Sequence, residues 1–221
     1  MSDFDQRGLD KIIKPDTGQS GYKIYNHEYI DNFIDRILYY RADTTLTQEL
    51  LEAANTLRGK LNGVEQKLAG DIKEEYYMIS PEQMFINLDL AERVWHNVVD
   101  NIRQHITLND PDIQFEMPEL WVNYQKPTEY NPLHLHGTNF SFVWYLDIPE
   151  QIRQEHLKQV GTTPSRGLID FVSSQSNDLK RFNPQTSDVF VFRSDHKHAV
   201  HPFYSECERV SMSGNIIAYK H

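Results

Sequence analysis

Cysteine is nearly absent from this sequence, because Cys207 is the only one among 221 residues. A single cysteine forms no disulfide within the chain and is typical of proteins that fold in a reducing compartment. The sequence also lacks long apolar runs, and none approaches the roughly 18 residues that a membrane helix needs. Residues 1–7 are polar and lack the apolar run of a signal peptide. These absences predict a soluble, cytoplasmic protein without a membrane segment.

The sequence is also short of basic residues, with 22 Lys and Arg against 32 Asp and Glu and a formal net charge of −10. A broad nucleic-acid surface needs clustered Lys and Arg, so this balance argues against nucleic acid as a partner. Hydrophobic residues make up 39% of the chain and aromatic residues 12%, which is sufficient for a packed core. We therefore expect one structural domain.

The first half of the chain is predicted to be helical. Residues 1–26 are rich in turn-forming residues and are interpreted as an arm, and residues 27–112 as a helical region that packs on the core. Apolar residues at a spacing of three and four predict three helices in that region. They are Tyr29–Leu38, Leu46–Arg58 with Thr45 as its N-cap and Gly59 at its end, and Pro81–His105 starting at Ser80-Pro81.

The second half, residues 113–221, changes to the two-residue period of strands. Short segments rich in β-branched and aromatic residues are bounded by turn residues: Leu120–Tyr124, Ser141–Leu146, Leu168–Val172, Asp188–Phe192 and Val210–Tyr219. Two further short strands are expected around His134 and Val200. Since no helices alternate with these strands, the pattern predicts an antiparallel sandwich or jelly roll. The fold class is α+β.

Three histidines in this half are candidate metal ligands. His134 and His136 are two residues apart, so on a strand both side chains face the same side. His198 lies far downstream and supplies a third imidazole, a ligand type that suits Fe, Zn, Ni or Cu. The neighbouring His196 and His201 compete for that role, and we interpret both as solvent-exposed.

Arg209 and Ser211 share one face of the last predicted strand. The planar fork of an arginine forms bidentate, charge-assisted hydrogen bonds with a carboxylate. A guanidinium and a hydroxyl side by side therefore predict a carboxylate-binding site close to the metal. The alternative is that Arg209 pairs with Glu206 or Glu208 on an exposed strand.

Taken together, residues 118–219 resemble the prolyl-4-hydroxylase-like branch of the non-haem iron, 2-oxoglutarate-dependent oxygenase superfamily. The resemblance lies in five segments: Trp121-Val122-Asn123-Tyr124, His134-Leu135-His136, Val143-Trp144-Tyr145-Leu146, Asp188–Phe192 with His198–Pro202, and Arg209-Val210-Ser211. Small oxygenase-like proteins encoded by bacteria and tailed phages share this layout. A phage origin would place the protein in the host cytoplasm. The fold that the resemblance implies is a double-stranded β-helix, or jelly roll, with a helical region in front of it.

The resemblance also implies roles for individual residues. His134, His136 and His198 would bind Fe(II), while Arg209 and Ser211 would hold the distal carboxylate of the co-substrate 2-oxoglutarate, with support from Tyr124. The implied reaction consumes O₂, oxidatively decarboxylates 2-oxoglutarate to succinate, and hydroxylates a C–H bond of a protein or a small molecule.

One departure from the family pattern is that His136 stands where the family has Asp or Glu. Three neutral imidazoles leave the metal one charge more positive than the usual two histidines and one carboxylate do. Asp195 or Glu129 would have to supply a carboxylate if the site needs one. Two alternatives stay open, a three-histidine cupin-type dioxygenase or isomerase without 2-oxoglutarate, and a non-catalytic metal-binding barrel.

The substrate is expected to enter at the mouth of the barrel. The long polar segment Glu150–Arg166 either forms a lid there or is an ordinary surface loop with a short helix over Gln151–Gln159. Phe142 and Trp144 either line the pocket or pack in the core.

Overall fold

The computed structural model describes residues 37–60, 70–80, 84–105, 112–161, 164–173 and 176–219. The arm predicted over residues 1–26 lies outside these residues. In chain order the elements are β1 (Ile37–Arg41), α2 (Thr44–Leu57), β2 (Glu75–Ile79), α3 (Leu88–His105), β3 (Gln114–Gln125), β4 (Asn131–His134), β5 (Phe140–Asp147), α4 (Glu150–Lys158), β6 (Ile169–Val172), β7 (Leu179–Phe182), β8 (Asp188–Arg193), β9 (Lys197–Val200) and β10 (Arg209–Tyr219).

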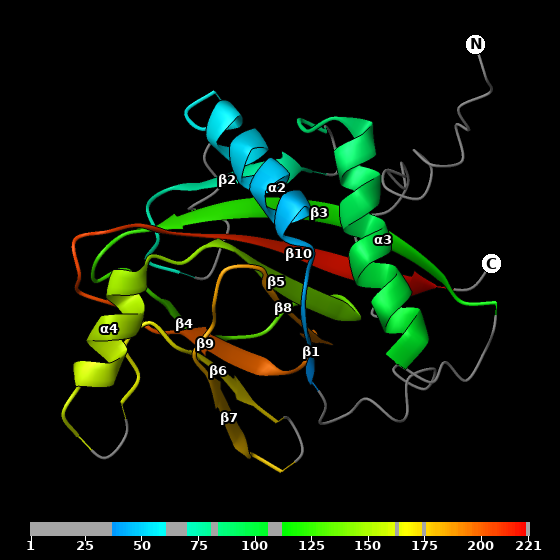
Figure 1. The fold of residues 1–221 in the computed structure, drawn as a ribbon. Coiled ribbons are helices and arrows are strands. Elements are labelled where there is room, and N and C mark those ends of the chain that lie inside the picture. The colour runs from blue at the N-terminus through cyan, green and yellow to red at the C-terminus, as the bar shows by residue number, and fades with distance from the viewer. Residues whose placement is uncertain are drawn as a thin grey trace.

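The strands form two antiparallel sheets, drawn in Figure 1. The large sheet has six strands in the order β1-β8-β5-β10-β3-β2, and the small sheet has four in the order β4-β9-β6-β7. From β3 onward the chain passes back and forth between the sheets: β3, β5, β8 and β10 join the large one, while β4, β6, β7 and β9 join the small one. Neither sheet is therefore formed by one continuous stretch of the chain.

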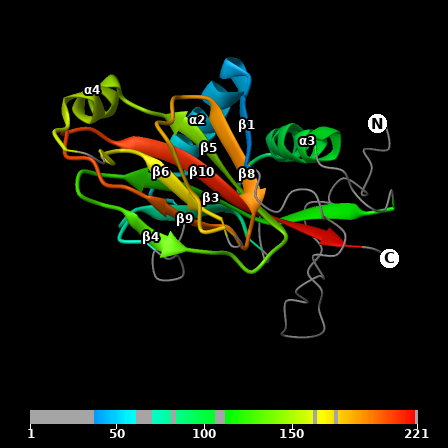
Figure 2. The same ribbon diagram turned by 90° about the horizontal axis from the view of Figure 1, so that it is seen from below.

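The molecule has three layers, as Figure 2 shows, with α2 and α3 on one face of the large sheet and the small sheet on the other. One apolar core lies between the helices and the large sheet and includes Leu50, Val98 and Trp144. A smaller, aromatic core lies between the sheets and includes Tyr145 and Phe171. Because both faces of the large sheet are covered, its central strands are buried on both sides.

The two helices that cover the large sheet begin at polar caps. The Asp43 carboxylate accepts a 2.9 Å hydrogen bond from the Leu46 amide, so α2 begins at Thr44 and the predicted cap Thr45 is wrong. The predicted end at Gly59 is confirmed, because Gly59 has a φ of +71° directly after the last turn.

The start predicted for the third helix is wrong. The Asn87 side chain caps α3 by accepting a 2.8 Å hydrogen bond from Leu90. Met84 forms a β-bridge with Ile79 instead of a helical turn. The helix predicted over Tyr29–Leu38 falls mostly outside the described residues, and its last two residues belong to strand β1.

The seven predicted strands are confirmed. Three more strands, β1, β2 and β7, were not predicted. The short helix expected over Gln151–Gln159 is also present as α4. The antiparallel strands predicted for residues 113–221 are thus confirmed, whereas the segment predicted to be helical, residues 27–112, contributes β1 and β2 to the large sheet as well as helices.

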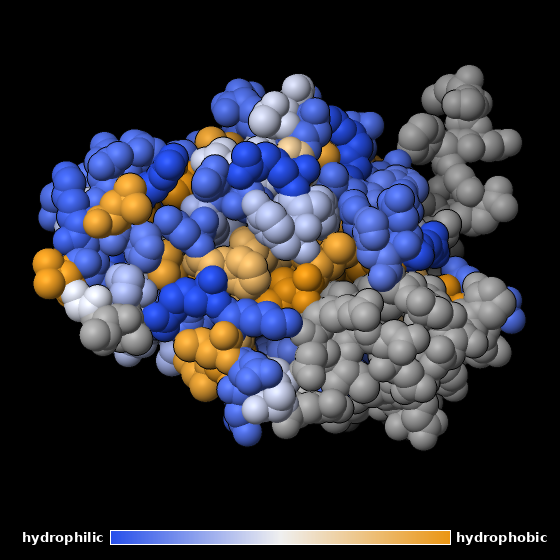
Figure 3. Space-filling view, turned by 60° about the horizontal axis from the view of Figure 1, so that its bottom comes forward, coloured by the Kyte–Doolittle hydropathy of each residue, from blue (hydrophilic) through white to orange (hydrophobic). Residues whose placement is uncertain are grey.

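None of the helices in the described ranges is long and apolar enough to cross a membrane. The face drawn in Figure 3 is largely hydrophilic, with hydrophobic residues in separate patches. Large apolar side chains that are exposed include Leu133, Leu135, Val160 and Leu179. Scattered exposed apolar residues are common in folded proteins and do not by themselves mark a binding surface.

Candidate metal centre

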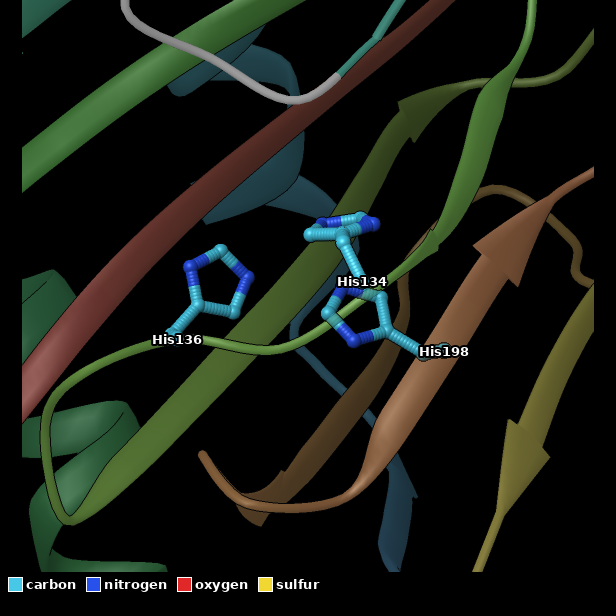
Figure 4. A group of neighbouring side chains, drawn as sticks. All are labelled: His134, His136 and His198. Carbon is cyan, nitrogen blue, oxygen red and sulfur yellow. The ribbon is translucent and has the colours of Figure 1, made fainter.

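The small sheet brings the three candidate histidines together. His134 on β4 and His198 on β9 are register partners, and His136 lies two residues beyond the end of β4. One ring nitrogen of each histidine lies within 4.8 Å of the others. The ring centroids are 4.1 Å apart for His134 and His198, and 5.1 Å apart for each pair with His136. Figure 4 shows the three rings converging on one space, as ligands of a single metal ion would.

All three imidazoles are neutral at physiological pH. Burial lowers the pKa of His136 to about 4, with a further decrease from the charge of His134. Burial is also the main cause of the lowered pKa of His134, and it keeps the pKa of His198 well below its usual value. A neutral imidazole is the form that binds a metal, so no proton has to leave before binding.

Backbone carbonyls determine which ring nitrogen is available. His134 Nδ1 lies 2.7 Å from the Pro132 carbonyl oxygen, and His198 Nδ1 lies 3.4 Å from that of His196. A carbonyl oxygen only accepts hydrogen bonds, so each Nδ1 must carry the hydrogen. The lone pair is then on Nε2, and the hydrogen bond at the other nitrogen fixes the ring orientation, as is usual for histidine ligands.

No carboxylate joins this cluster among the described residues, where the histidines form a group by themselves. Asp195 is paired with Arg193 at 2.6 Å, and Glu129 accepts a 2.9 Å hydrogen bond from the Lys126 amide. The two carboxylates considered as a substitute for the family's acidic ligand thus have other partners. Three imidazole nitrogens fit Fe, Zn, Ni or Cu.

Arg209, the predicted carboxylate anchor, is 1% exposed at the start of β10. Its guanidinium donates hydrogen bonds to the side-chain oxygen of Gln125 and to the carbonyl oxygen of Gly167, the latter at 2.6 Å. In the described part of the chain no salt bridge joins Arg209 to an acid, so the alternative pairing with Glu206 or Glu208 is not observed. A buried cation with only neutral partners is costly, which makes the position suited to binding an anion.

A row of polar side chains lies beside Arg209. Ser211 has register partners on both sides, Asn123 on β3 and Tyr145 on β5. The Arg209 guanidinium carbon lies 5.5 Å from the centre of the Tyr145 ring. The Tyr145 hydroxyl and the Asn123 side-chain oxygen are buried without a hydrogen-bond partner. Such orphaned buried polar atoms indicate room for a polar ligand.

The anchor and the histidines face the same interior. Tyr145 belongs to the core between the sheets, together with Phe171 and Phe192. The rings of Phe192 and Phe171 lie 4.7 and 6.0 Å from that of His198. This interior therefore contains an imidazole cluster, an aromatic wall and a buried guanidinium.

Tyr124, the other predicted carboxylate-binding residue, is not brought to this interior. It belongs to the core between the large sheet and the helices, and the Arg58 guanidinium stacks on its ring at 4.0 Å. Its neighbours Asn123 and Gln125 face the other way. Tyr145, which the sequence analysis missed as a binding residue, lies where Tyr124 was expected. The burial of every position from Phe140 to Leu146 left no sequence signal that distinguishes Tyr145 from Tyr124.

Two of the remaining histidines differ from the prediction. His196 is 2% exposed and therefore not a surface residue. His201 is partly buried, and its Nε2 lies 2.7 Å from Asp170, whose carboxylate also pairs with Arg181. Both were predicted to be solvent-exposed, and both predictions are wrong, because the β9 region is enclosed by neighbouring segments.

Phe142 and Trp144 pack in the core and do not line the site. Both lie in the cluster under the helices, and Trp144 Nε1 donates a 3.1 Å hydrogen bond to Thr47 of α2. The packing interpretation is confirmed. Trp121, on the opposite face of the sheet, contacts the site instead, with its ring 6.0 Å from that of His136.

Comparisons with known proteins agree with this geometry. Residues 119–215 match the family described as "Putative 2OG-Fe(II) oxygenase". No curated protein matches the chain. A solved prolyl-4-hydroxylase from Pseudomonas putida is 17% identical, with a TM-score of 0.55, over 85% of this chain and 94% of that one.

Two further solved structures are similar. The viral collagen prolyl hydroxylase from Paramecium Bursaria Chlorella virus-1, in complex with 2OG, is 13% identical with a TM-score of 0.55 over 85% of this chain and 97% of that one. HygX from Streptomyces hygroscopicus, with nickel and 2-oxoglutarate bound, is 12% identical with a TM-score of 0.55 over 84% of this chain and 83% of that one. The resemblance predicted from the motifs is confirmed, and the predicted enzyme class and Fe(II)/2-oxoglutarate pair are those of the matched family.

Proposed function

We propose that this chain, whose residues 119–215 match the 2-oxoglutarate/Fe(II) oxygenase family, hydroxylates a C–H bond of a protein or small-molecule substrate. The observation that carries the proposal is one interior with two features, a cluster of three neutral histidines and a buried guanidinium without an acidic partner in the described residues. The first suits a metal ion and the second an organic acid.

In this proposal His134, His136 and His198 hold the iron, His134 and His198 through Nε2. Their Nδ1 hydrogens are directed to backbone carbonyls for His134 and His198, so the rings need little reorientation on binding. When bound, the iron would activate O₂, which oxidises both 2-oxoglutarate and the substrate C–H bond. The residues of the chain bind, orient and shield these groups.

Arg209 and Ser211 bind the distal carboxylate of 2-oxoglutarate. A carboxylate at Arg209 would neutralise a charge that burial disfavours, as the lowered pKa of Arg209 indicates. Burial raises the pKa of Tyr145 to about 12, so its hydroxyl keeps its proton and is able to donate a hydrogen bond to the same carboxylate. Tyr145 takes the place that the sequence analysis gave to Tyr124.

The aromatic core between the sheets keeps water away from the reaction. Phe171, Phe190 and Phe192 are each 1% exposed and lie between Tyr145 and His198. Electrostatic interactions in such a dry interior are stronger than in water, which favours tight binding of the acid.

The proposal extends to the fold. The two sheets are interpreted as the faces of a double-stranded β-helix, because the strands from β3 to β10 alternate between them. The segment predicted as a helical region that packs on the core, residues 27–112, supplies β1 and β2 to the edges of the large sheet. We therefore regard residues 27–112 and 113–221 as parts of one structural domain.

The experiment is an uncoupled turnover assay, since the substrate is not identified. Wild-type protein with Fe(II), ascorbate and O₂ is expected to release succinate from 2-oxoglutarate, and His198→Ala and Arg209→Ala are expected to abolish or strongly reduce the release. Succinate release that Arg209→Ala leaves intact would refute the role of Arg209 as the carboxylate anchor. Bound iron without succinate release would favour the cupin-type reaction. Bound zinc without any turnover would favour a non-catalytic barrel.

A further inference from the structure

The ends of two neighbouring strands carry different groups on their two faces. Arg209 and Gln125 are register partners where β10 begins and β3 ends, and they are hydrogen-bonded on the inner face. Their chain neighbours are Glu208 and Tyr124, and Tyr124 lies on the outer face. Figure 1 shows that β3 ends and β10 begins on the same side of the large sheet. A contact that fixes Glu208 or Tyr124 on the outer face is therefore adjacent in the chain to Arg209 or Gln125 on the inner face.

Arg58, the residue that ends α2, holds this outer face. Its guanidinium donates two hydrogen bonds to Glu74, at 2.5 and 2.7 Å, and two to Glu208, at 2.8 and 2.7 Å. We call Arg58, Glu74 and Glu208 the Arg58 clamp. It links α2, the residue before β2 and the residue before Arg209. An isolated surface ion pair contributes little, but a doubly bidentate arginine has the geometry that makes such a pair effective.

The Arg58 clamp also includes a ring contact and a further ion pair. Arg58 stacks on the Tyr124 ring at 4.0 Å, and Lys126 adds a 2.9 Å ion pair to Glu74. The Arg58 hydrogen bonds are the main cause that lowers the pKa of Glu74 to about 2, so this carboxylate is ionised at any physiological pH. The side chains are largely shielded, with 31% of Arg58, 18% of Glu74 and 29% of Glu208 exposed.

We propose that Arg58 is a positioning residue for the 2-oxoglutarate site, acting through Glu208 on the adjacent Arg209. Arg209 is the first residue of β10 and follows the irregular connection from β9, so its backbone would otherwise be free to fray. The Arg58 clamp fixes this strand end from outside and keeps the guanidinium aligned for a carboxylate, which lowers the ordering cost of binding. The inference rests on the function proposed above.

The test compares Arg58→Gln with Arg93→Gln in the full-length, metal-loaded protein. Arg93 is a matched control, because it also extends from a helix to an acid, Glu49 of α2, but it contacts neither β3 nor β10. Calorimetric titration with 2-oxoglutarate under anaerobic conditions should show about a tenfold weaker affinity for Arg58→Gln. The metal affinity should stay unchanged, and Arg93→Gln should change neither affinity by more than about twofold.

Thermal unfolding separates positioning from stability. Arg58→Gln removes the ion pairs with both Glu74 and Glu208 and should lower Tm more than Arg93→Gln, which removes a more exposed pair with Glu49. Only Arg58→Gln should lose affinity for 2-oxoglutarate. Arg58→Lys, which keeps the charge without the fork, should recover part of that affinity. An unchanged 2-oxoglutarate affinity in Arg58→Gln overturns the proposal, whatever its Tm. If wild-type protein binds the metal but no 2-oxoglutarate, the proposed function fails as well, so the two failures are distinguishable.

Discussion

Replacing Arg209 with methionine should remove 2-oxoglutarate binding at almost no cost in stability. Methionine approximates the length of the arginine stem, so the replacement deletes mainly the charge. Two charge-assisted hydrogen bonds to a carboxylate contribute about 1.5–3 kcal/mol each. Their loss predicts a Kd for 2-oxoglutarate that is at least ~100-fold higher, since 1.4 kcal/mol corresponds to a factor of ten.

Arg209→Met should change the free energy of unfolding of the ligand-free protein only slightly, because the loss of hydrogen bonds and the removal of a buried charge have opposite effects. The variant leaves the Gln125 side-chain oxygen and the Gly167 carbonyl without a donor, at about 1–3 kcal/mol for each group. It also removes a fully buried cation with no acidic partner in the described residues, which relieves several kcal/mol of desolvation, by rough estimate. We expect the free energy of unfolding to change by no more than about 1 kcal/mol.

Arg181→Met is the contrasting variant. Arg181 pairs with Asp170, whose side chain is 7% exposed, so its removal leaves a carboxylate with only His201 as partner. It should destabilise the protein clearly more than Arg209→Met does. Urea unfolding of the metal-free proteins, with calorimetric titration of 2-oxoglutarate, measures both effects. Strong destabilisation by Arg209→Met, or unchanged affinity for 2-oxoglutarate, would refute the reasoning.

Three other changes have defined outcomes. The pKa of His136 is lower in the folded protein than in the unfolded chain, so the unfolded chain binds more protons and the free energy of unfolding should decrease as pH falls below about 6.5. His136→Gln should make this decrease smaller, as measured by urea unfolding of the metal-free protein at several pH values. In Gly214→Ala the new methyl would meet a Phe142 ring atom at 2.5 Å, so calorimetry should show a loss of about 1–3 kcal/mol. Trp144→Phe, which loses the hydrogen bond to Thr47, should cost about 1–3 kcal/mol while the metal affinity stays unchanged.

The clustering of the three candidate metal ligands was predictable because their spacing has a direct geometric meaning. Two histidines two residues apart share a strand face, and the structure pairs His134 with His198 on the neighbouring strand. The inner position of Arg209 and Ser211 follows from the same alternation. These inferences needed only the local strand period.

The choice between Tyr124 and Tyr145 was not predictable in this way. Residues 120–125 and 140–146 are buried at every position, because the large sheet is covered by helices on one face and by the small sheet on the other. The hydrophobic pattern therefore does not distinguish the two faces, and only the complete sheet register does.

The errors in the front part have tertiary causes. The last residues of the predicted helix Tyr29–Leu38 pair with β8, and this pairing outweighs the apolar spacing. Strand β2 has only five residues directly after the charged residues Lys73 and Glu74, and it pairs with β3. Strand β7, with the sequence Leu-Lys-Arg-Phe, is largely exposed and lacks the apolar pattern of a core strand. Local propensity is too weak to predict these elements.

The most direct test of the central claim is an anaerobic titration of metal-free protein with Fe(II) and then with 2-oxoglutarate, followed by visible absorption. The account predicts a metal-to-ligand charge-transfer band that appears only after 2-oxoglutarate is added, is absent in His134→Ala, and requires much more 2-oxoglutarate in Arg209→Met. If no band forms in wild-type protein that has bound Fe(II), 2-oxoglutarate does not chelate the iron at the three-histidine site, and the oxygenase assignment is contradicted.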